Sequence, residues 1–268
     1  MHLPTCRQQG ASEEMCAEYY VGTSGWSYNH WRGVFYPDGL PSGKWLEFYA
    51  QRFPSVELNA SFYRLPTEGA FRRWHDVVPG GFRFAVKASR FITHIRKLRD
   101  AEESLGTFLG RAGILGEKLG PVLYQLPPSM GRDDGLLEAF LTLLPHGLQH
   151  VFEFRNDSWY DEGVLDLLRR HGAAFCVHDM HPLETPVVAT AAFAYLRFHG
   201  TSGRYAGCYS DEELEAWAEA IRRMASGLET VYAYFNNDIG GHAVGNASTL
   251  ARMLAGNGSA EAGDNVTR

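Results

Sequence analysis

Cysteine is scarce in this chain, and its few cysteines lie far apart. The four are Cys6, Cys16, Cys176 and Cys208, with no C-x-x-C pair and no zinc-type spacing with histidine. Such a set provides neither a disulfide framework nor a structural metal site, and it suits a reducing compartment. We therefore expect a cytoplasmic location.

Long apolar runs are also missing. No run reaches the roughly 18 residues that a membrane-spanning helix needs, and residues 1–18 contain no apolar segment of the signal-peptide kind. We therefore expect neither secretion nor a membrane partner.

An excess of positive charge is the third absence. The 25 lysines and arginines stand against 31 aspartates and glutamates, which gives a formal net charge of −6 at pH 7. This balance argues against a general polyanion-binding surface, although it allows one local basic pocket. Residues 22–28 are rich in glycine and hydroxyl groups but lack the P-loop lysine and the G-x-G-x-x-G spacing. No cofactor is therefore predicted.

What the sequence does contain is a repeated alternation of strand-like and helix-like segments. Its 268 residues are 45% hydrophobic and 21% charged, and eight strand-helix units need roughly 250 residues. The β-rich runs are residues 19–25, 55–60, 82–87, 121–125, 150–155, 173–179, 193–199 and 231–236. Helical periodicity marks residues 44–52, 68–77, 100–118, 134–144, 162–171 and 210–225. This order predicts an α/β fold, a TIM-type (β/α)8 barrel.

One crossover and both ends depart from the alternation. Between Asp179 and Phe193 the sequence is typical of an irregular loop, so the crossover helix after the sixth strand is expected to be missing or degraded. Residues 1–18 are predicted to be a disordered extension, and residues 256–268, polar and glycine-rich, a disordered tail. A single barrel domain is predicted over residues 19–255, with no prediction of oligomeric state.

Polar and charged residues end most of the predicted strands. Side chains two apart in a strand point to the same side, and the outer side of a barrel meets helices, so the polar side is expected to face inward. The carboxyl ends of barrel strands hold the active site in essentially all barrel enzymes. Three pairs on this face are Glu57 with Asn59, Glu153 with Arg155, and Arg197 with His199.

Two carboxylates and three cations on one face indicate a small anionic substrate. Glu57 and Glu153 are candidates for acid and base, while Lys87, Arg155 and Arg197 are suited to anchor a phosphate or carboxylate. The chain is predicted to be a hydrolase or lyase acting on a small anionic, sugar-like or nucleotide-derived compound. The catalytic candidates are Glu57, Glu153, Lys87 and His199. The substrate-binding candidates are Ser24, Trp26, Asn59, Tyr63, Gln125, Arg155, Asp179, Arg197, Asn236 and Asn237.

Two alternatives use the same strand ends differently. The charges can form a buried ion-pair network without chemistry, for example Glu57 with Lys87 and Glu153 with Arg155. A divalent-metal-dependent isomerase or hydrolase is the other alternative. No H-x-H or H-E-x-x-H spacing supports it and the nearby cations would repel a metal, so no metal site is predicted. Its ligands would be His199, His178, Asp179, Glu57 and Glu153.

A non-catalytic barrel that binds nucleic acid or another ligand is a further alternative, one that is not favoured. It would use a basic run and loop aromatics, although a solvated helix face explains the first and sealing of loops explains the second. The basic run is Lys87, Arg90, His94, Arg96, Lys97 and Arg99. The loop aromatics are Trp26, Tyr28, Trp31, Phe62, Tyr63, Trp159 and Tyr160.

A series of short motifs resembles a known family. They are Gly22 to Trp26, Glu57 to Asn59 with Phe62 and Tyr63, Phe84 to Lys87, Gln125 to Pro128, Glu153 to Arg155 with Trp159, Arg197 to Gly200, and Tyr234 to Asn237 with Asn246 and Ala247. In this order, from about Tyr19 to Leu254, they are similar to the YecE-like family, the domain of unknown function 72. The resemblance implies a TIM-type barrel, an intracellular protein and a motif role for the strand ends. It implies no substrate and no catalytic assignment.

Overall fold

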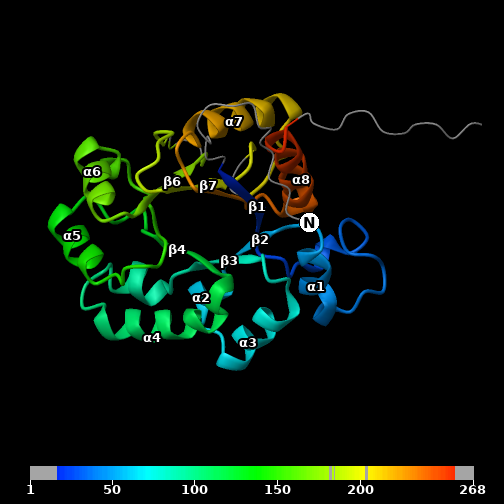
Figure 1. Cartoon of the computed structure of the whole chain (residues 1–268), viewed down its shortest axis with the longest axis horizontal. Helices are drawn as coiled ribbons and strands as arrows, with labels where there is room; N and C mark the ends of the chain where they lie inside the picture. Colours follow the sequence, from blue (N-terminus) through cyan, green and yellow to red (C-terminus); the bar gives the residue numbers. More distant parts are fainter. Residues whose placement is uncertain (1–16, 181–182, 184, 203–204, 257–268) are drawn as a thin grey trace, which may run out of the picture.

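Eight parallel strands close into a barrel surrounded by helices (Figure 1). The computed structural model describes residues 17–180, 183, 185–202 and 205–256. The strands pair in sequence order and β1 pairs with β8, which confirms the predicted TIM-type barrel. The strands are β1 (Glu18–Ser24), β2 (Ser55–Leu58), β3 (Arg83–Lys87), β4 (Leu119–Gln125), β5 (His150–Glu153), β6 (Ala174–His178), β7 (Phe193–Phe198) and β8 (Thr230–Phe235). The α-helices are α1 (Trp45–Ala50), α2 (Ala60–Tyr63), α3 (Glu68–Val77), α4 (Glu102–Ala112), α5 (Asp134–Thr142), α6 (Glu162–Arg170), α7 (Asp211–Met224) and α8 (His242–Leu254).

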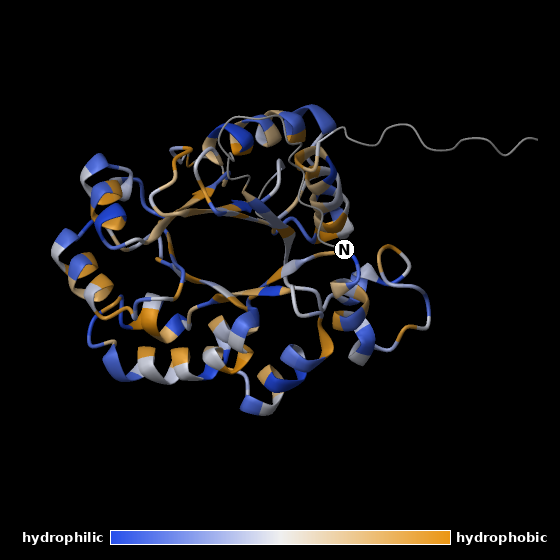
Figure 2. Cartoon of the chain, viewed as in Figure 1, coloured by the Kyte–Doolittle hydropathy of each residue, from blue (hydrophilic) through white to orange (hydrophobic). Residues whose placement is uncertain are grey.

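The strands alternate between two apolar environments. Leu123 and Val151 belong to a cluster inside the barrel, whereas Val122 and Phe152 belong to the larger core between strands and helices. Parallel strands that are covered on both faces carry nearly continuous apolar runs, as these do. Figure 2 shows the same arrangement, with orange residues along the strands and mixed orange and blue residues on the outer helices.

Tyrosine rings fill the barrel beneath its carboxyl end. Tyr20 stacks on Tyr232 with ring centroids 5.3 Å apart, and the Tyr195 ring lies 5.2 Å from that of Tyr234. The interior of such a barrel is a packed core and not a pore. The tyrosines therefore form a floor under the polar residues at the strand ends.

Three details of the helices qualify the predictions. The helix predicted over residues 100–118 is two elements, α4 and the 3-10 helix η4 (Gly113–Lys118), and Gly116 with a φ of 53° breaks the helical conformation inside η4. Helix α8 goes beyond the predicted set. Between β6 and β7 the described residues contain no helix, as expected from the sequence.

The two ends of the domain lie close to the predicted boundaries. The first strand begins at Glu18 and the last helix ends at Leu254. Almost all of the two segments predicted to be disordered falls outside the described residues. Among the helices of the described ranges, none is both long and apolar enough to cross a membrane.

Candidate functional site

The side chains of Glu57 and Glu153 meet the same guanidinium inside the barrel. Arg197 Nη2 lies 2.7 Å from Glu57 Oε1, and Arg197 Nη1 lies 2.7 Å from Glu153 Oε2. All three side chains are buried. The strand ends of β2, β5 and β7 thus converge inside the barrel, as their period-two pattern predicts.

Glu57 is held on both of its oxygens. Its Oε2 accepts a hydrogen bond of 2.7 Å from the Tyr195 hydroxyl, which rises from the tyrosine floor. Its Oε1 accepts a second bond from Ser24 Oγ, and Asn59 Nδ2 donates to that Oγ over 2.6 Å. β1 and β2 are therefore tied to the same carboxylate.

Glu153 faces two arginines. Its Oε1 contacts Arg155 Nη2, while Oε2 accepts from Arg197. Burial alone would raise the pKa of Glu153, but the charges of Arg155 and Arg197 outweigh it and hold that pKa well below its ordinary value. Glu153 is thus a stable anion at neutral pH, and the Glu153–Arg155 pair considered from the sequence is present.

His199 joins this network as a neutral ring. Burial, followed by the charges of Arg155 and Arg197, lowers the pKa of His199 well below its ordinary value. Its Nε2 lies 2.8 Å from Arg155 Nη2, a geometry in which the ring accepts and the guanidinium donates. Asp179 Oδ1 accepts from the His199 backbone N–H over 2.8 Å, and the Tyr209 hydroxyl donates to Asp179 Oδ2. Burial raises the pKa of Asp179.

Lys87 stands apart from this network. Its Nζ lies 4.3 Å from the ring centroid of Phe62, and no carboxylate among the described residues is within ion-pair distance. Burial, followed by the charge of Arg197, lowers the pKa of Lys87 from 10.5 to about 8. The Glu57–Lys87 ion pair considered from the sequence is not formed, because Glu57 pairs with Arg197 instead.

The remaining predicted binding residues divide into three groups. Gln125 and Asn236 are partly exposed at the ends of β4 and β8, and their side chains make no hydrogen bond within the described residues. Asn237 is buried on the other face of its strand and donates to Gly207 O and Asn246 Oδ1, both over 2.9 Å. It therefore lies away from the barrel mouth. Tyr63 is 82% exposed.

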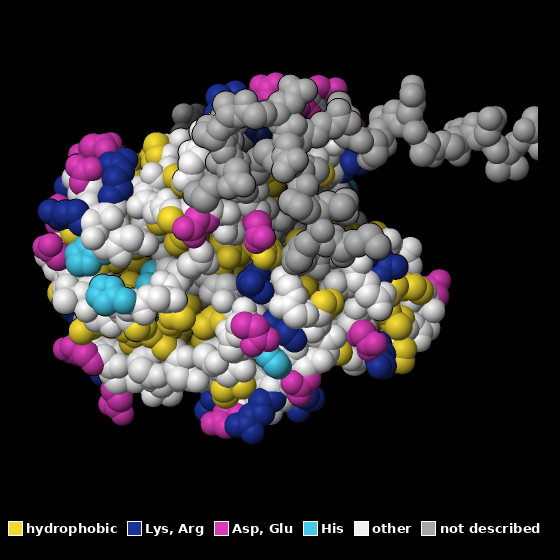
Figure 3. All heavy atoms as spheres, viewed as in Figure 1, with side chains coloured by type: hydrophobic (Ala, Val, Ile, Leu, Met, Phe, Trp, Pro, Cys, Tyr) yellow, Lys and Arg dark blue, Asp and Glu magenta, His cyan; other side chains and the backbone are white. Residues whose placement is uncertain are grey.

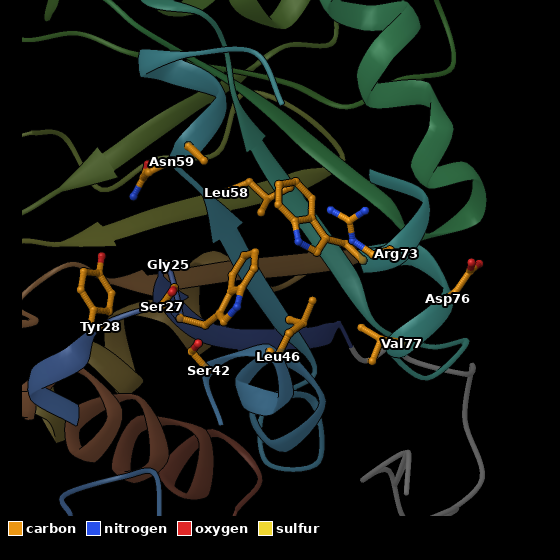
Figure 4. Close-up of a pocket in the computed structure, with 14 residues that line it drawn as sticks. Gly25, Ser27, Tyr28, Ser42, Leu46, Leu58, Asn59, Arg73, Asp76 and Val77 are labelled. Carbon is orange, nitrogen blue, oxygen red and sulfur yellow. The ribbon is translucent and has the colours of Figure 1, made fainter. Parts of the chain in front are cut away.

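Trp26 lies in a groove beside the barrel mouth. The groove has a volume of about 810 Å³ and passes between α1 and α3, over Leu58 on the outer face of β2. Figure 4 shows Asn59 near one end and Arg73 and Val77 at the other. Trp26 and Trp74 meet edge to face there, with ring centroids 5.5 Å apart. Asn59 is shared between this groove and the Ser24–Glu57 contact.

Several residues of the site escape a sequence reading that stops at strand ends. Tyr195 lies two residues before Arg197 on β7, so the same period-two rule would have found it. Tyr209 and Trp74 lie on a loop and a helix, and only the fold brings them to the site. Conversely, Trp31 and Trp159 are fully buried and seal their loops onto the core.

The geometry offers little support for the metal-dependent and nucleic-acid-binding alternatives. In the described part of the chain no three His, Cys, Asp or Glu side chains converge to hold a metal ion. Within the basic run, Arg96 lies 3.9 Å from Asp100, and Arg99 lies 3.7 Å from Asp133. On the face drawn in Figure 3, basic and acidic side chains are interspersed around the rim.

Comparison with known proteins agrees with this architecture. The profile of the family described as "Protein of unknown function DUF72" matches residues 20–266. UPF0759 protein YunF of Bacillus subtilis (strain 168) is 28% identical over 269 residues, which cover 88% of this chain and 94% of that protein. UPF0759 protein YecE of Escherichia coli (strain K12) is 32% identical over 145 residues, 54% of this chain and 51% of that protein. A solved DUF72 family protein from Thermotoga maritima MSB8 has a TM-score of 0.82 at 31% identity, covering 88% of this chain and 99% of that one.

Proposed function

This chain belongs to the DUF72 family, and we propose that it is an enzyme, a hydrolase or lyase, that acts on a small anionic molecule at the carboxyl end of its barrel. The observation that carries the proposal is the Lys87 ammonium, which has no carboxylate partner among the described residues. Lys87 is partly buried, and a cation that is withdrawn from water without a partner is costly to a fold unless something compensates it. An anionic group of a substrate would supply the missing charge.

The neighbours of Lys87 suit an oxyanion. The register of β2 against β3 pairs Leu58 with Val86, which places Asn59 beside Lys87. Gln125 and Asn236 offer side-chain amides at the same end of the barrel. Amide and ammonium donors that converge on one place are the usual means of binding and stabilising an oxyanion.

Two groups are suited to proton transfer. Lys87, with its pKa of about 8, is close to the pKa that general acid-base catalysis favours near neutral pH. Glu153, a carboxylate candidate for acid-base catalysis from the sequence, is the second group. If a substrate anion binds Arg155, Oε1 of Glu153 is released from its contact with that arginine and becomes a base. Glu57 holds Arg197 in position whether or not a substrate anion binds Arg155.

The groove beside the mouth supports a sugar-like or nucleotide-derived substrate. It meets the Lys87 side of the barrel at Asn59 and carries the rings of Trp26 and Trp74. Indole faces and edges suit the flat surface of a base or the C–H face of a sugar. A molecule with its anionic group between Lys87 and Arg155 would place such a moiety in the groove.

Anion binding can be tested by calorimetric titration with inorganic phosphate, ribose 5-phosphate and adenosine monophosphate. We expect Arg155→Met to weaken binding by about 10-fold or more, because it removes a charge-assisted hydrogen bond. Arg99→Met is the matched control, since Arg99 is 58% exposed and pairs with Asp133 outside the buried network. Equal affinities for wild type and Arg155→Met would contradict the proposal.

Catalysis needs a separate test. Small molecules enriched from a cell extract by the wild-type protein are incubated with wild type and with Lys87→Met, and the products are identified by mass spectrometry. We expect consumption by the wild type alone, with water added to the products of a hydrolase and none added by a lyase. Recovery of the enriched compound unchanged would favour a non-catalytic binding barrel.

A further inference from the structure

Lys87 differs from the other lysines of the chain in its surroundings. The chain contains four: Lys44, Lys87, Lys97 and Lys118. Lys118 is buried, and its Nζ donates to His75 O over 2.5 Å and to Val78 O over 2.9 Å. Lys44 lies on the surface and pairs with Glu47 over 2.8 Å. Lys87 alone of the four ends a barrel strand and faces inward.

The position of Lys87 favours a reactive amine. Its Nζ lies over the face of Phe62, and burial followed by the charge of Arg197 disfavours a further positive charge, against the opposing effect of Glu153 and Glu57. The Phe62 ring also contacts His94, with ring centroids 5.0 Å apart. A lysine that is desolvated or placed beside other cations is a known form of activated nucleophile.

We propose that Lys87 forms a Schiff base with a small anionic aldehyde or ketone. This inference rests on the anion site proposed above and names the substrate class for it. The anionic group of the substrate would bind Arg155, which is at the edge of the buried network, while the carbonyl carbon reaches Lys87 Nζ. Asn59, beside Lys87, is placed to donate to the carbonyl oxygen.

The reaction balances without an oxidant or a cofactor. The neutral amine of Lys87 adds its electron pair to the carbonyl carbon, and the carbonyl oxygen takes up a proton to give a carbinolamine. The amine proton is then released, and the protonated hydroxyl group leaves as one water molecule, which forms the imine. Water added back restores the amine and the carbonyl. A protonated imine withdraws electrons from the adjacent carbon, which is the chemistry that a lyase needs.

Borohydride trapping tests the proposal on the full chain. Wild type is incubated near neutral pH with glyoxylate or with glyceraldehyde 3-phosphate and sodium cyanoborohydride, and the four lysines are followed by peptide mass mapping. A pKa of about 8 instead of 10.5 raises the neutral amine fraction near neutral pH by about 300-fold. We expect Lys87 to be labelled at least about 10-fold faster than Lys44, and excess phosphate to slow only the Lys87 reaction.

Two variants keep the result interpretable. Lys87→Arg retains the positive charge and should lose the fast label, whereas Lys44→Arg should keep it. Circular dichroism of both variants checks that they are folded. Equal labelling of Lys44 and Lys87, or a fast label that survives in Lys87→Arg, would overturn the Schiff base.

The same experiment separates this inference from the proposed function. If Lys87 is not labelled but phosphate binding still depends on Arg155, the Schiff base is wrong and the anion site stands. If Lys87 is not labelled and phosphate does not bind at all, both are wrong.

Discussion

On the β5 and β7 side of the barrel mouth each charged side chain lies against an opposite charge, whereas on the β3 side Lys87 lies against none in the described structure. Arg197 bridges Glu57 and Glu153, and Arg155 caps the outer oxygen of Glu153. Lys87 contacts the aromatic face of Phe62, and although Glu57 and Glu153 act on it electrostatically, neither forms an ion pair with it. The strand ends of this barrel therefore carry both ion-paired charges and one charge without an ion-pair partner in the described structure.

The difference separates what maintains the site from what is available to a ligand. A closed network of buried charges is stable as a unit, because removing one member leaves its partners uncompensated. The partly buried ammonium of Lys87 has no such support, so its presence calls for a ligand or a reaction. Variants of Glu57, Glu153 and Arg197 should accordingly lose stability, whereas variants of Lys87 should lose chemistry and stay folded. Arg155 belongs to both sides, because it pairs with Glu153 and is also proposed to bind the substrate anion.

The largest loss of stability is expected from Arg197→Met. This change leaves two buried carboxylates without their shared guanidinium, and we expect the free energy of unfolding to fall by about 3–5 kcal/mol. Urea denaturation at neutral pH measures it. The triple variant Glu57→Gln, Glu153→Gln, Arg197→Met should regain much of the loss, because no ionised carboxylate then needs a partner. A loss of less than about 1 kcal/mol for Arg197→Met would show that the network is not what maintains this side.

For Lys87 the comparison can be sharpened with pH. The pKa of Lys87 is lowered from 10.5 to about 8 in the folded chain, so between these values the unfolded chain binds more protons. The free energy of unfolding should then rise with pH through that window, by about 1–3 kcal/mol from this group. The groups that act on Lys87 are Glu57 on β2, His94 after β3, Glu153 and Arg155 at the end of β5, and Arg197 on β7.

Lys87→Met carries all of those groups and lacks only the titrating amine. The difference between the wild-type and variant urea curves at about pH 7 and about pH 10 therefore isolates Lys87. We expect the variant to be at least as stable as wild type at the lower pH and to show the smaller rise. Parallel pH dependences would mean that the Lys87 ammonium is solvated and not destabilised by burial.

The sequence was sufficient for the barrel and for the direction of the strand-end side chains. Both depend on local patterns, namely apolar runs and the period of two. Two residues that are two apart in one predicted strand, such as Glu153 and Arg155, point to the same side of it. Helix α8 had a signal of the same kind in Ala243, Ala247 and Leu250, which are buried at helical spacing. Gly245 and Asn246, residues with weak helix propensity, obscure it.

The pairing of charges across the barrel was beyond the sequence. Glu57 and Arg197 are 140 residues apart, and their contact depends on the shear of the closed sheet and on side-chain rotamers. A nearest-strand guess pairs Glu57 with Lys87 and misses the bridge. The same applies to Tyr209 and Asn246, whose positions are set by a loop and a helix packed outside the sheet.

A smaller loss of stability is expected from Asn237→Ala. The Asn237 amide is buried and joins Gly207 O and Asn246 Oδ1 over 2.9 Å each. Truncation leaves both acceptors without this donor, and we expect a loss of about 1–3 kcal/mol by thermal or urea unfolding. Phosphate affinity should not change, because Asn237 lies on the outer face of its strand. A weakened phosphate titration with unchanged stability would place Asn237 at the mouth instead.

The smallest effect on stability is expected one residue earlier in the chain. Asn236 is partly exposed, and its side chain makes no hydrogen bond within the described ranges. Asn236→Ala should therefore change the free energy of unfolding by less than about 0.5 kcal/mol. Its amide is available to an oxyanion at the barrel mouth, so phosphate affinity should fall by about 3–10-fold, the value of one hydrogen bond. Of these two neighbouring asparagines, Asn237 is thus expected to affect stability and Asn236 to affect binding. Unchanged phosphate affinity in Asn236→Ala would restrict the open site to Lys87 and Asn59, which follows β2.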